Sequence, residues 1–406
     1  MSSHTEETTL VSIDARTTFV PSMAVRQTAS RFFFVDQVCV VLTILAILHH
    51  LSATYNGIIP TWYYLEVTND QVTIILLTIF MLINQSFFMS CFFLISGYVL
   101  SGLYDRNGAR AFLRDCFQRL GIPLLIFSVV IGPTLSYLGL TTSTAPEVRQ
   151  WLKMPYWMQY GFLISPGPLW FVEALLLFAC LYTFWRKFPG KSSREASDKH
   201  LPPFISTNTP PTLGAIAVFT LLLAVMIFLV RIWFPYGRII PLVNIIPSNL
   251  PQYIGFFIIG CIASRRNWFL STPSSMGKIG VGAAIGATVF LFPLAVSDIS
   301  FLGGMHWQAF VFALWEAIMS VGISLGLLVL SKEHKHRQRR LGKFLATQAY
   351  VAYIIHAPVI VCLTYAVRDV HLHPLLKFGL VALLAVPLCF GCGYLLRKLP
   401  VARTLL

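Results

Sequence analysis

Apolar runs of about twenty or more residues recur along the whole chain and constrain its fold more than any other feature. The first of them, residues 32–53, contains no lysine or arginine and a single acid, Asp36. A helix needs about 20 apolar residues to cross the hydrocarbon core of a bilayer. The composition agrees, since 56% of the residues are hydrophobic and 11% are charged, where soluble domains carry roughly 25% charge. The sequence therefore predicts an all-α polytopic membrane protein.

The hydrophobic pattern predicts about ten transmembrane helices. The second run is unusually long, and we expect a single tilted helix there rather than two broken ones. Most of the 30 lysines and arginines fall in the segments that would be cytosolic if the N-terminus is cytosolic. This bias obeys the positive-inside rule and predicts cytosolic N and C termini. The predicted spans are 32–53, 71–104, 120–140, 168–187, 212–234, 249–265, 278–297, 307–330, 344–366 and 375–397.

The remaining segments are short or polar. We expect residues 1–31 to form a disordered cytosolic tail and the first span to act as an uncleaved targeting signal. Residues 188–211, rich in serine, proline and charge, are predicted to be a disordered cytosolic loop, and 399–406 a short cytosolic tail. Residues 32–398 then form one transmembrane domain.

The chain's net charge of +14 does not indicate a nucleic-acid partner. The basic residues lie in short loops between apolar runs, so orientation in the lipid bilayer explains them better. The one CxxC pair, Cys389 and Cys392, lies in a hydrophobic run, which favours packing over redox or metal chemistry. We therefore predict no metal site and no bound cofactor.

The first span carries polar residues on one helical face. Asp36, Cys39, Thr43 and His50 follow one another at intervals of 3, 4 and 7 residues, and His49 is rotated away and is expected to face elsewhere. Ionisable groups within a membrane helix are costly and suggest a functional site. His50 lies about 21 Å beyond Asp36 along the axis, so any partner that orients it must come from another helix. Its imidazole suits a general base; the alternative is a structural hydrogen bond.

Three further acidic or histidine residues lie within predicted spans. Glu173 and Glu316 must be neutral or paired, and either could clamp two helices or belong to a site. His356 precedes Ala357–Pro358, and the proline frees a backbone carbonyl. A local structural hydrogen bond is therefore the expected use of His356.

A basic cluster follows the second span. Its members could grip the phosphates of an anionic cosubstrate, or could contact lipid head groups and set topology. Without other information the second reading is favoured. The cluster consists of Arg106, Arg110, Arg114 and Arg119.

Taken together, several blocks resemble the acyltransferase 3 family of integral membrane acyltransferases, in particular the branch with glucan-modifying enzymes of the succinyltransferase type and similar fungal proteins. The resemblance covers nearly the whole chain after residue 31, and it is specific because separate blocks recur in order. The blocks are FVDQVCVVLTILAILHH (34–50), INQSFFMSCFFLISGYVLSGLYDRNGARAFLRDCFQRLGIPLLIF (83–127), GPLWFVEALLLF (167–178), NLPQYIGFFIIGCIASRRNWF (249–269), HWQAFVFALWEAIMSVGISLGLLVL (306–330) and AYVAYIIHAPVIV (349–361).

The resemblance implies transfer of an acyl group, acetyl or succinyl in type, from cytosolic acyl-CoA to a hydroxyl of a carbohydrate or small metabolite. It also implies that His50 is the catalytic histidine. The family's Ser-Gly-aromatic signature is kept in Ser96 and Tyr98, and its basic segment in Arg114 and Arg119, which we expect to hold the acyl-CoA phosphates.

The sequence departs from the family pattern at Cys39. The family has an arginine there, eleven residues before the histidine, and a thiol offers neither its charge nor its donors. Three explanations are open: another arginine (Arg31, Arg114 or Arg119) has taken over, the reaction differs, or activity is lost. The alternatives to an acyltransferase are a multi-span transporter or flippase of a small molecule, and an inactive acyltransferase-like scaffold.

Overall fold

The computed structural model describes residues 33–57, 62–66, 68–141, 153–187, 209–240, 245–333 and 340–400. The predicted tails and the predicted loop at 188–211 lie wholly or largely outside these ranges. Within them the secondary structure is helical apart from one antiparallel bridge between Ile240 and Ile245. The all-α prediction is confirmed.

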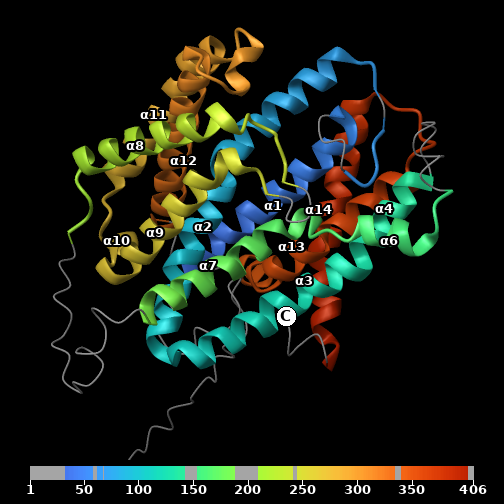
Figure 1. The fold of residues 1–406 in the computed structure, drawn as a ribbon, viewed down its shortest axis with the longest axis horizontal. Helices are drawn as coiled ribbons and strands as arrows, with labels where there is room; N and C mark the ends of the chain where they lie inside the picture. The colour runs from blue at the N-terminus through green and yellow to red at the C-terminus, as the bar shows by residue number, and fades with distance from the viewer. Residues whose placement is uncertain are drawn as a thin grey trace, which may run out of the picture.

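All ten predicted runs are helical. Figure 1 shows the helices running alongside one another through the molecule. The elements are α1 (Phe33–Asn56), α2 (Gln71–Cys116), η1 (Phe117–Gly121), α3 (Ile122–Ile126), η2 (Phe127–Ile131), α4 (Gly132–Thr141), α6 (Tyr156–Leu163), η3 (Gly167–Leu169), α7 (Trp170–Lys187), α8 (Leu213–Trp233), η4 (Pro247–Asn249), α9 (Leu250–Arg266), α10 (Trp268–Ser271), α11 (Ser274–Ala295), η5 (Ile299–Leu302), α12 (Trp307–Glu333), α13 (Arg340–Ala366) and α14 (Pro374–Lys398).

Eight segments of the described chain are long and apolar enough to cross a membrane. The difference from the predicted ten has two causes. The second segment, Gln71–Thr141, has 71 residues and contains two predicted spans, and α9, with 17 residues, is short for one crossing of about 20. The direction in which the helices cross, and the cytosolic placement of the termini, stay predictions.

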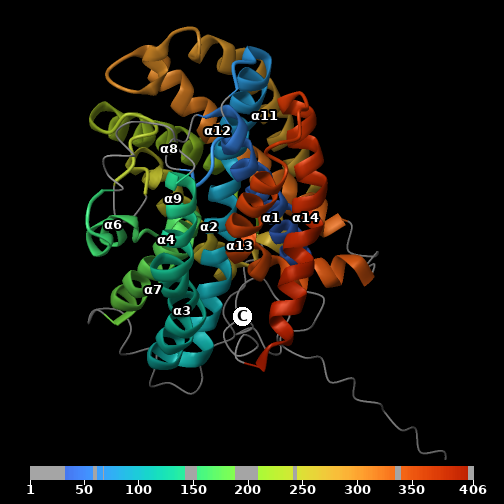
Figure 2. The same ribbon diagram turned by 90° about the vertical axis from the view of Figure 1, so that its right-hand side faces the viewer.

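The long second segment bends at one glycine. Gly108 has φ 71° and ψ 165°, the one non-helical position inside α2, and a positive φ is readily adopted by glycine. The chain descends along α2 and returns along α3 and α4 (Figure 2). The predicted single helix over 71–104 is confirmed, because α2 continues without a break up to Gly108.

Helix α1 packs against α2, α12, α13 and α14, which places it inside the bundle. Small residues set the closest helix contacts elsewhere. A Cβ atom on Gly97 of α2 would lie 2.1 Å from the carbonyl oxygen of Phe257 on α9, and one on Gly260 of α9 would lie 2.1 Å from that of Leu94. Helices in lipid associate by such close van der Waals packing, and this pairing anchors α9 beside α2.

Candidate active site

A cavity of about 530 Å³ lies at the Asn56 end of α1. We call it the histidine cavity. Its wall combines α1, α2, α4, α6, α7, α9 and α13 with the segments that follow α1, precede α7 and precede α9. The lining residues are His49, His50, Trp62, Tyr63, Gln85, Phe88, Met89, Ser136, Phe162, Leu163, Ile164, Ser165, Gly167, Pro168, Trp170, Ile239, Ile246, Tyr253 and Tyr353.

His50 is held through one of its ring nitrogens. Its Nδ1 lies 2.9 Å from the carbonyl oxygen of Ala46, one turn earlier in α1, and 3.2 Å from Nε2 of His356 on α13. A carbonyl oxygen only accepts, so Nδ1 carries the proton in the neutral ring. The lone pair is then on Nε2, which has no hydrogen-bond partner among the described residues. His50 thus offers a base nitrogen to the cavity.

His356 completes this assignment. It is fully buried, and its Nδ1 donates to the carbonyl oxygen of Tyr353 in the same helix, which is the local hydrogen bond predicted from the sequence. Its Nε2 therefore has a lone pair and accepts from Nδ1 of His50. The orienting partner that His50 requires from another helix is His356. These two residues are 306 positions apart in the chain.

His49 lies on the same cavity, although the helical spacing predicted that it faces elsewhere. This part of α1, about two turns before its end at Asn56, lines the cavity with both neighbouring positions. The side chain is 6% exposed and its ring centroid is 5.2 Å from that of Phe88. Its Nδ1 is buried without a hydrogen-bond partner among the described residues.

The loop after α1 covers His50. The Trp62 ring centroid is 5.1 Å from that of His50, with 30° between the planes, and the indole N–H donates to Thr54 Oγ1 over 2.9 Å. Tyr63 fills the space beside Gly167, where φ is +49° and a Cβ atom would lie 2.1 Å from the Tyr63 hydroxyl. Sequence reasoning missed both aromatic residues because a loop has no periodicity that reveals which way its side chains point.

Polar contacts fix that loop to the start of α14. Lys377 is 1% exposed, and its ammonium group donates to Glu66 Oε1 at 2.8 Å and to the carbonyl oxygen of Arg368 at 3.0 Å. His373 Nε2 lies 3.2 Å from Asp70 Oδ2. Hydrogen bonds from Thr73 lower the pKa of Asp70, so this cap stabilises the fold above the ordinary pKa of an aspartate and weakens as pH falls below it.

The hydroxyl group of Tyr253 on α9 belongs to a second polar residue of the cavity wall. The hydroxyl oxygen of Tyr253 accepts hydrogen bonds from Gln85 Nε2 at 3.0 Å and from Asn249 Nδ2 at 3.3 Å. With both lone pairs used, the Tyr253 hydroxyl can still donate its own proton. The wall therefore contains a base nitrogen on α1 and a hydroxyl donor on α9.

The rest of the predicted stripe on α1 does not line the cavity. Cys39 and Thr43 are fully buried in the bundle and Asp36 is partly buried. The departure from the family's arginine at Cys39 is thus a change within the packed interior of the bundle. It does not alter the wall that surrounds His50.

Other predicted site residues lie in helix contacts. Ser96 is buried next to the Gly97 contact, and Tyr98 stacks on Phe269 with ring centroids 4.2 Å apart. Glu316 pairs with the buried Arg231 of α8, a clamp between α12 and α8. Glu173 has one carboxylate oxygen buried without a partner in the described ranges.

The two predicted phosphate-binding arginines differ in position. The Arg114 side chain is 72% exposed, at the end of the bundle opposite the histidine cavity. Arg119 lies against α13, where the Tyr350 hydroxyl donates to its carbonyl oxygen at 2.6 Å. Tyr350 and His356 are six residues apart on α13, about 9 Å along the axis. Of the two arginines, Arg119 is the one whose backbone contacts α13, the helix that carries His356.

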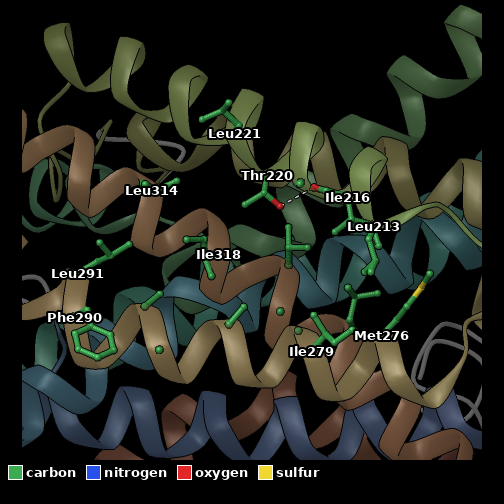
Figure 3. A pocket seen from close by; sticks show the side chains of 18 residues that line it. Leu213, Ile216, Thr220, Leu221, Met276, Ile279, Phe290, Leu291, Leu314 and Ile318 are labelled. Carbon is green, nitrogen blue, oxygen red and sulfur yellow. Dashed lines mark hydrogen bonds between the residues drawn. The ribbon is translucent and has the colours of Figure 1, made fainter.

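A second large cavity lies between α8, α11 and α12 and has a different character. It measures about 720 Å³, and we call it the apolar cavity. Figure 3 shows its lining, in which Thr220 is the one residue with a polar side chain; its hydroxyl donates to the carbonyl oxygen of Ile216 at 2.8 Å. No lining group of this cavity can exchange a proton or hold a charge.

A sequence profile of the acyltransferase 3 family, described as an acyltransferase domain, matches residues 33–394. The chain belongs to this family. It is therefore an integral membrane, multi-pass acyltransferase, and the family expected from the sequence blocks is confirmed.

Relatives with known names share this domain over most of their length. The chain is 24% identical over 342 residues to glucans biosynthesis protein C of Escherichia coli O6:K15:H31, which covers 82% of each chain. It is 24% identical over 361 residues to the protein of that name from Escherichia coli O1:K1, covering 86% of this chain and 83% of the relative. No solved structure matches the chain.

Proposed function

We propose that this acyltransferase moves an acyl group, acetyl or succinyl in type, from acyl-CoA to a hydroxyl of a carbohydrate, with His50 as general base. The observation that carries the proposal is the hydrogen-bonded state of His50. Its Nδ1 is held by Ala46 and His356, and its unpartnered Nε2 belongs to a residue of the cavity wall. A general base needs such a free lone pair within reach of the hydroxyl that it deprotonates.

The reaction is a direct transfer. Nε2 of His50 takes the proton of the acceptor hydroxyl as its oxygen bonds to the thioester carbonyl carbon. The tetrahedral intermediate then collapses, the carbon–sulfur bond breaks, and the CoA thiolate leaves and receives the proton from the imidazolium. Nε2 of His356 accepts a hydrogen bond from the Nδ1–H group of His50, which keeps its proton during the reaction, so His356 holds the ring in the tautomer that the reaction requires.

Acyl-CoA would enter from the Arg114 end of the bundle, on the predicted cytosolic side. Arg119 and Arg114 supply positive charge for its phosphates, and guanidinium groups suit phosphate oxygens. The backbone of Arg119 is bonded to Tyr350, on the same helix as Tyr353 and His356. Helix α13 thus joins the proposed phosphate site to the histidine cavity.

The acceptor would enter from the opposite end, where the loops after α1 and before α7 meet. The wall is mostly aromatic and aliphatic, with a few polar groups such as Gln85, Ser136 and Tyr253, a combination that orients ligands in pockets of this size. The similar proteins named for glucan biosynthesis support a carbohydrate as the acceptor.

Cys39 has no positive charge, so under this proposal another group supplies the charge that the family pattern places on an arginine at this position. We infer that Arg119 does so, because its backbone already contacts the helix that carries His356. Cys39 is fully buried, so a substitution Cys39→Arg would force a large charged side chain into the packed bundle, where removing it from water is costly even beside Asp36. Under this proposal Cys39→Arg lowers stability and brings no gain in activity.

The proposal is tested with the purified full-length protein and isotopically labelled acetyl-CoA or succinyl-CoA. The acceptors are β-glucan oligosaccharides, with glycerol as a small-molecule alternative, and mass spectrometry detects the ester. We expect a labelled, base-labile glucan ester and free CoA in equal amounts. Accumulation of substrate inside proteoliposomes without consumption of acyl-CoA would instead show a transporter.

A further inference from the structure

His49 and His50 are adjacent in the chain and share one cavity. Their ring centroids are 5.5 Å apart, with 75° between the planes. Both line the histidine cavity, yet the hydrogen bonds described above involve only His50. The proposed general-base step therefore leaves a buried imidazole of the same cavity without a role.

The surroundings of His49 indicate where its proton lies. Nδ1 is buried and has no acceptor among the described residues. An N–H group without an acceptor in an apolar interior is costly. The proton is therefore better placed on Nε2, on the part of the ring that reaches the cavity and can meet water or a ligand. Phe88, 5.2 Å away between ring centroids, packs against this ring.

The two neighbouring imidazoles thus present opposite hydrogen-bonding groups to one space. His50 offers the lone pair of Nε2, whereas His49 offers an N–H. Of the other N–H groups of the wall, the Trp62 indole donates to Thr54 and one hydrogen of the Gln85 amide donates to Tyr253. A base and a hydrogen-bond donor side by side are what an acyl transfer needs.

We propose that His49 is a further catalytic residue, whose Nε2–H donates a hydrogen bond to the carbonyl oxygen of the acyl thioester. This inference rests on the proposed function, since it requires the thioester in the histidine cavity. As the acceptor oxygen bonds to the carbonyl carbon, the carbonyl π electrons move onto oxygen, and His49 stabilises that oxyanion. The hydroxyl proton passes to His50, and the negative charge leaves with the CoA thiolate when the carbon–sulfur bond breaks.

Kinetics of matched variants give the first test. His49→Leu removes the donor, whereas His49→Gln keeps an N–H near the position of Nε2. Removing one oxyanion donor typically lowers kcat by about 10²–10³, so we expect a loss of about that size for His49→Leu with little change in KM for acyl-CoA. His49→Gln should recover part of the loss, and His371→Leu, at an exposed histidine, should behave as wild type.

Infrared spectroscopy then separates this inference from the proposed function. Acetyl-CoA labelled with ¹³C at its carbonyl is bound without acceptor, and the carbonyl band is compared with that of free acetyl-CoA. We expect a shift to lower frequency in the wild type and in inactive His50→Ala, and no shift in His49→Leu. A shift that persists in His49→Leu would overturn the role of His49 alone. Absence of a bound carbonyl band in the wild type would overturn the proposed function, and this inference with it.

Discussion

The histidine cavity and the apolar cavity have comparable volumes, about 530 and 720 Å³, but their polar groups are in opposite states. In the apolar cavity the Thr220 hydroxyl already donates to the backbone of its own helix. In the histidine cavity, Nε2 of His50 has no hydrogen-bond partner among the described residues, and His49 lines the same cavity. A membrane protein must satisfy its polar groups internally, so a nitrogen left open beside a cavity marks the place where a substrate can supply the partner.

The comparison also explains why size is a poor guide to function here. The walls of the apolar cavity, on α8, α11 and α12, present side chains that suit lipid or a neighbouring helix. The walls of the histidine cavity come from seven helices and the segments between them, and a buried lysine on α14 holds the loop after α1 in place. These polar contacts hold the loop that covers His50, and this loop is no part of the larger cavity.

The largest expected effect is that of removing the base. General-base catalysis contributes typically 10²–10⁴ in rate, so His50→Ala should lower acyl transfer by about that factor while the protein still folds. Turnover by mass spectrometry and thermal unfolding in detergent measure the two quantities. Near wild-type turnover in His50→Ala would contradict the assignment of the catalytic base to the histidine cavity.

His356→Leu should have the next largest effect. It removes one of the two acceptors of the His50 Nδ1–H group and leaves the Ala46 carbonyl. Loss of the partner that orients a metal-binding histidine typically costs about 10–100-fold, and we expect a loss within that range here. His356→Gln, which retains an acceptor, should recover part of the activity. The pH dependence of kcat/KM separates positioning from packing: the limb that reports the base should move in His356→Leu. An unchanged profile would leave His356 a packing residue only.

Arg119→Ala should raise KM for acyl-CoA about tenfold with a smaller change in kcat, since a charged hydrogen bond contributes roughly 1.5–3 kcal/mol. The Arg114 side chain is largely in solvent, so Arg114→Ala should raise KM less. Initial rates at varied acyl-CoA measure both. Equal and small effects of the two substitutions would assign this basic cluster to lipid contact and topology.

The smallest effect is expected in the apolar cavity. Thr220→Val keeps the volume of the side chain and removes a hydroxyl that bonds only its own helix, so turnover should stay within about twofold of the wild type. Turnover measured alongside His50→Ala tests this directly. A loss comparable to that of His50→Ala would show that the apolar cavity takes part in the reaction.

Sequence alone predicts the helices well because the bilayer demands long apolar runs, each of which satisfies its own backbone. It also singles out His50, because an ionisable side chain within a membrane span costs free energy. The partner of His50 could not be assigned, because the contact with His356 joins α1 to α13 across 306 positions and depends on how the helices pack. His49 was placed elsewhere by helical spacing, and Trp62 and Tyr63 lie in a loop without a pattern. Contacts between distant helices are what sequence periodicity does not contain.

The most direct test of the central claim is a structure of the wild-type protein with a thioether analogue of acyl-CoA and a glucan oligosaccharide bound together. The account predicts an acceptor hydroxyl oxygen at hydrogen-bond distance, roughly 2.6–3.2 Å, from Nε2 of His50, with Nδ1 still facing Ala46 and His356. An acceptor bound away from the histidine cavity, or an Nε2 bonded to a protein group in that complex, would contradict it.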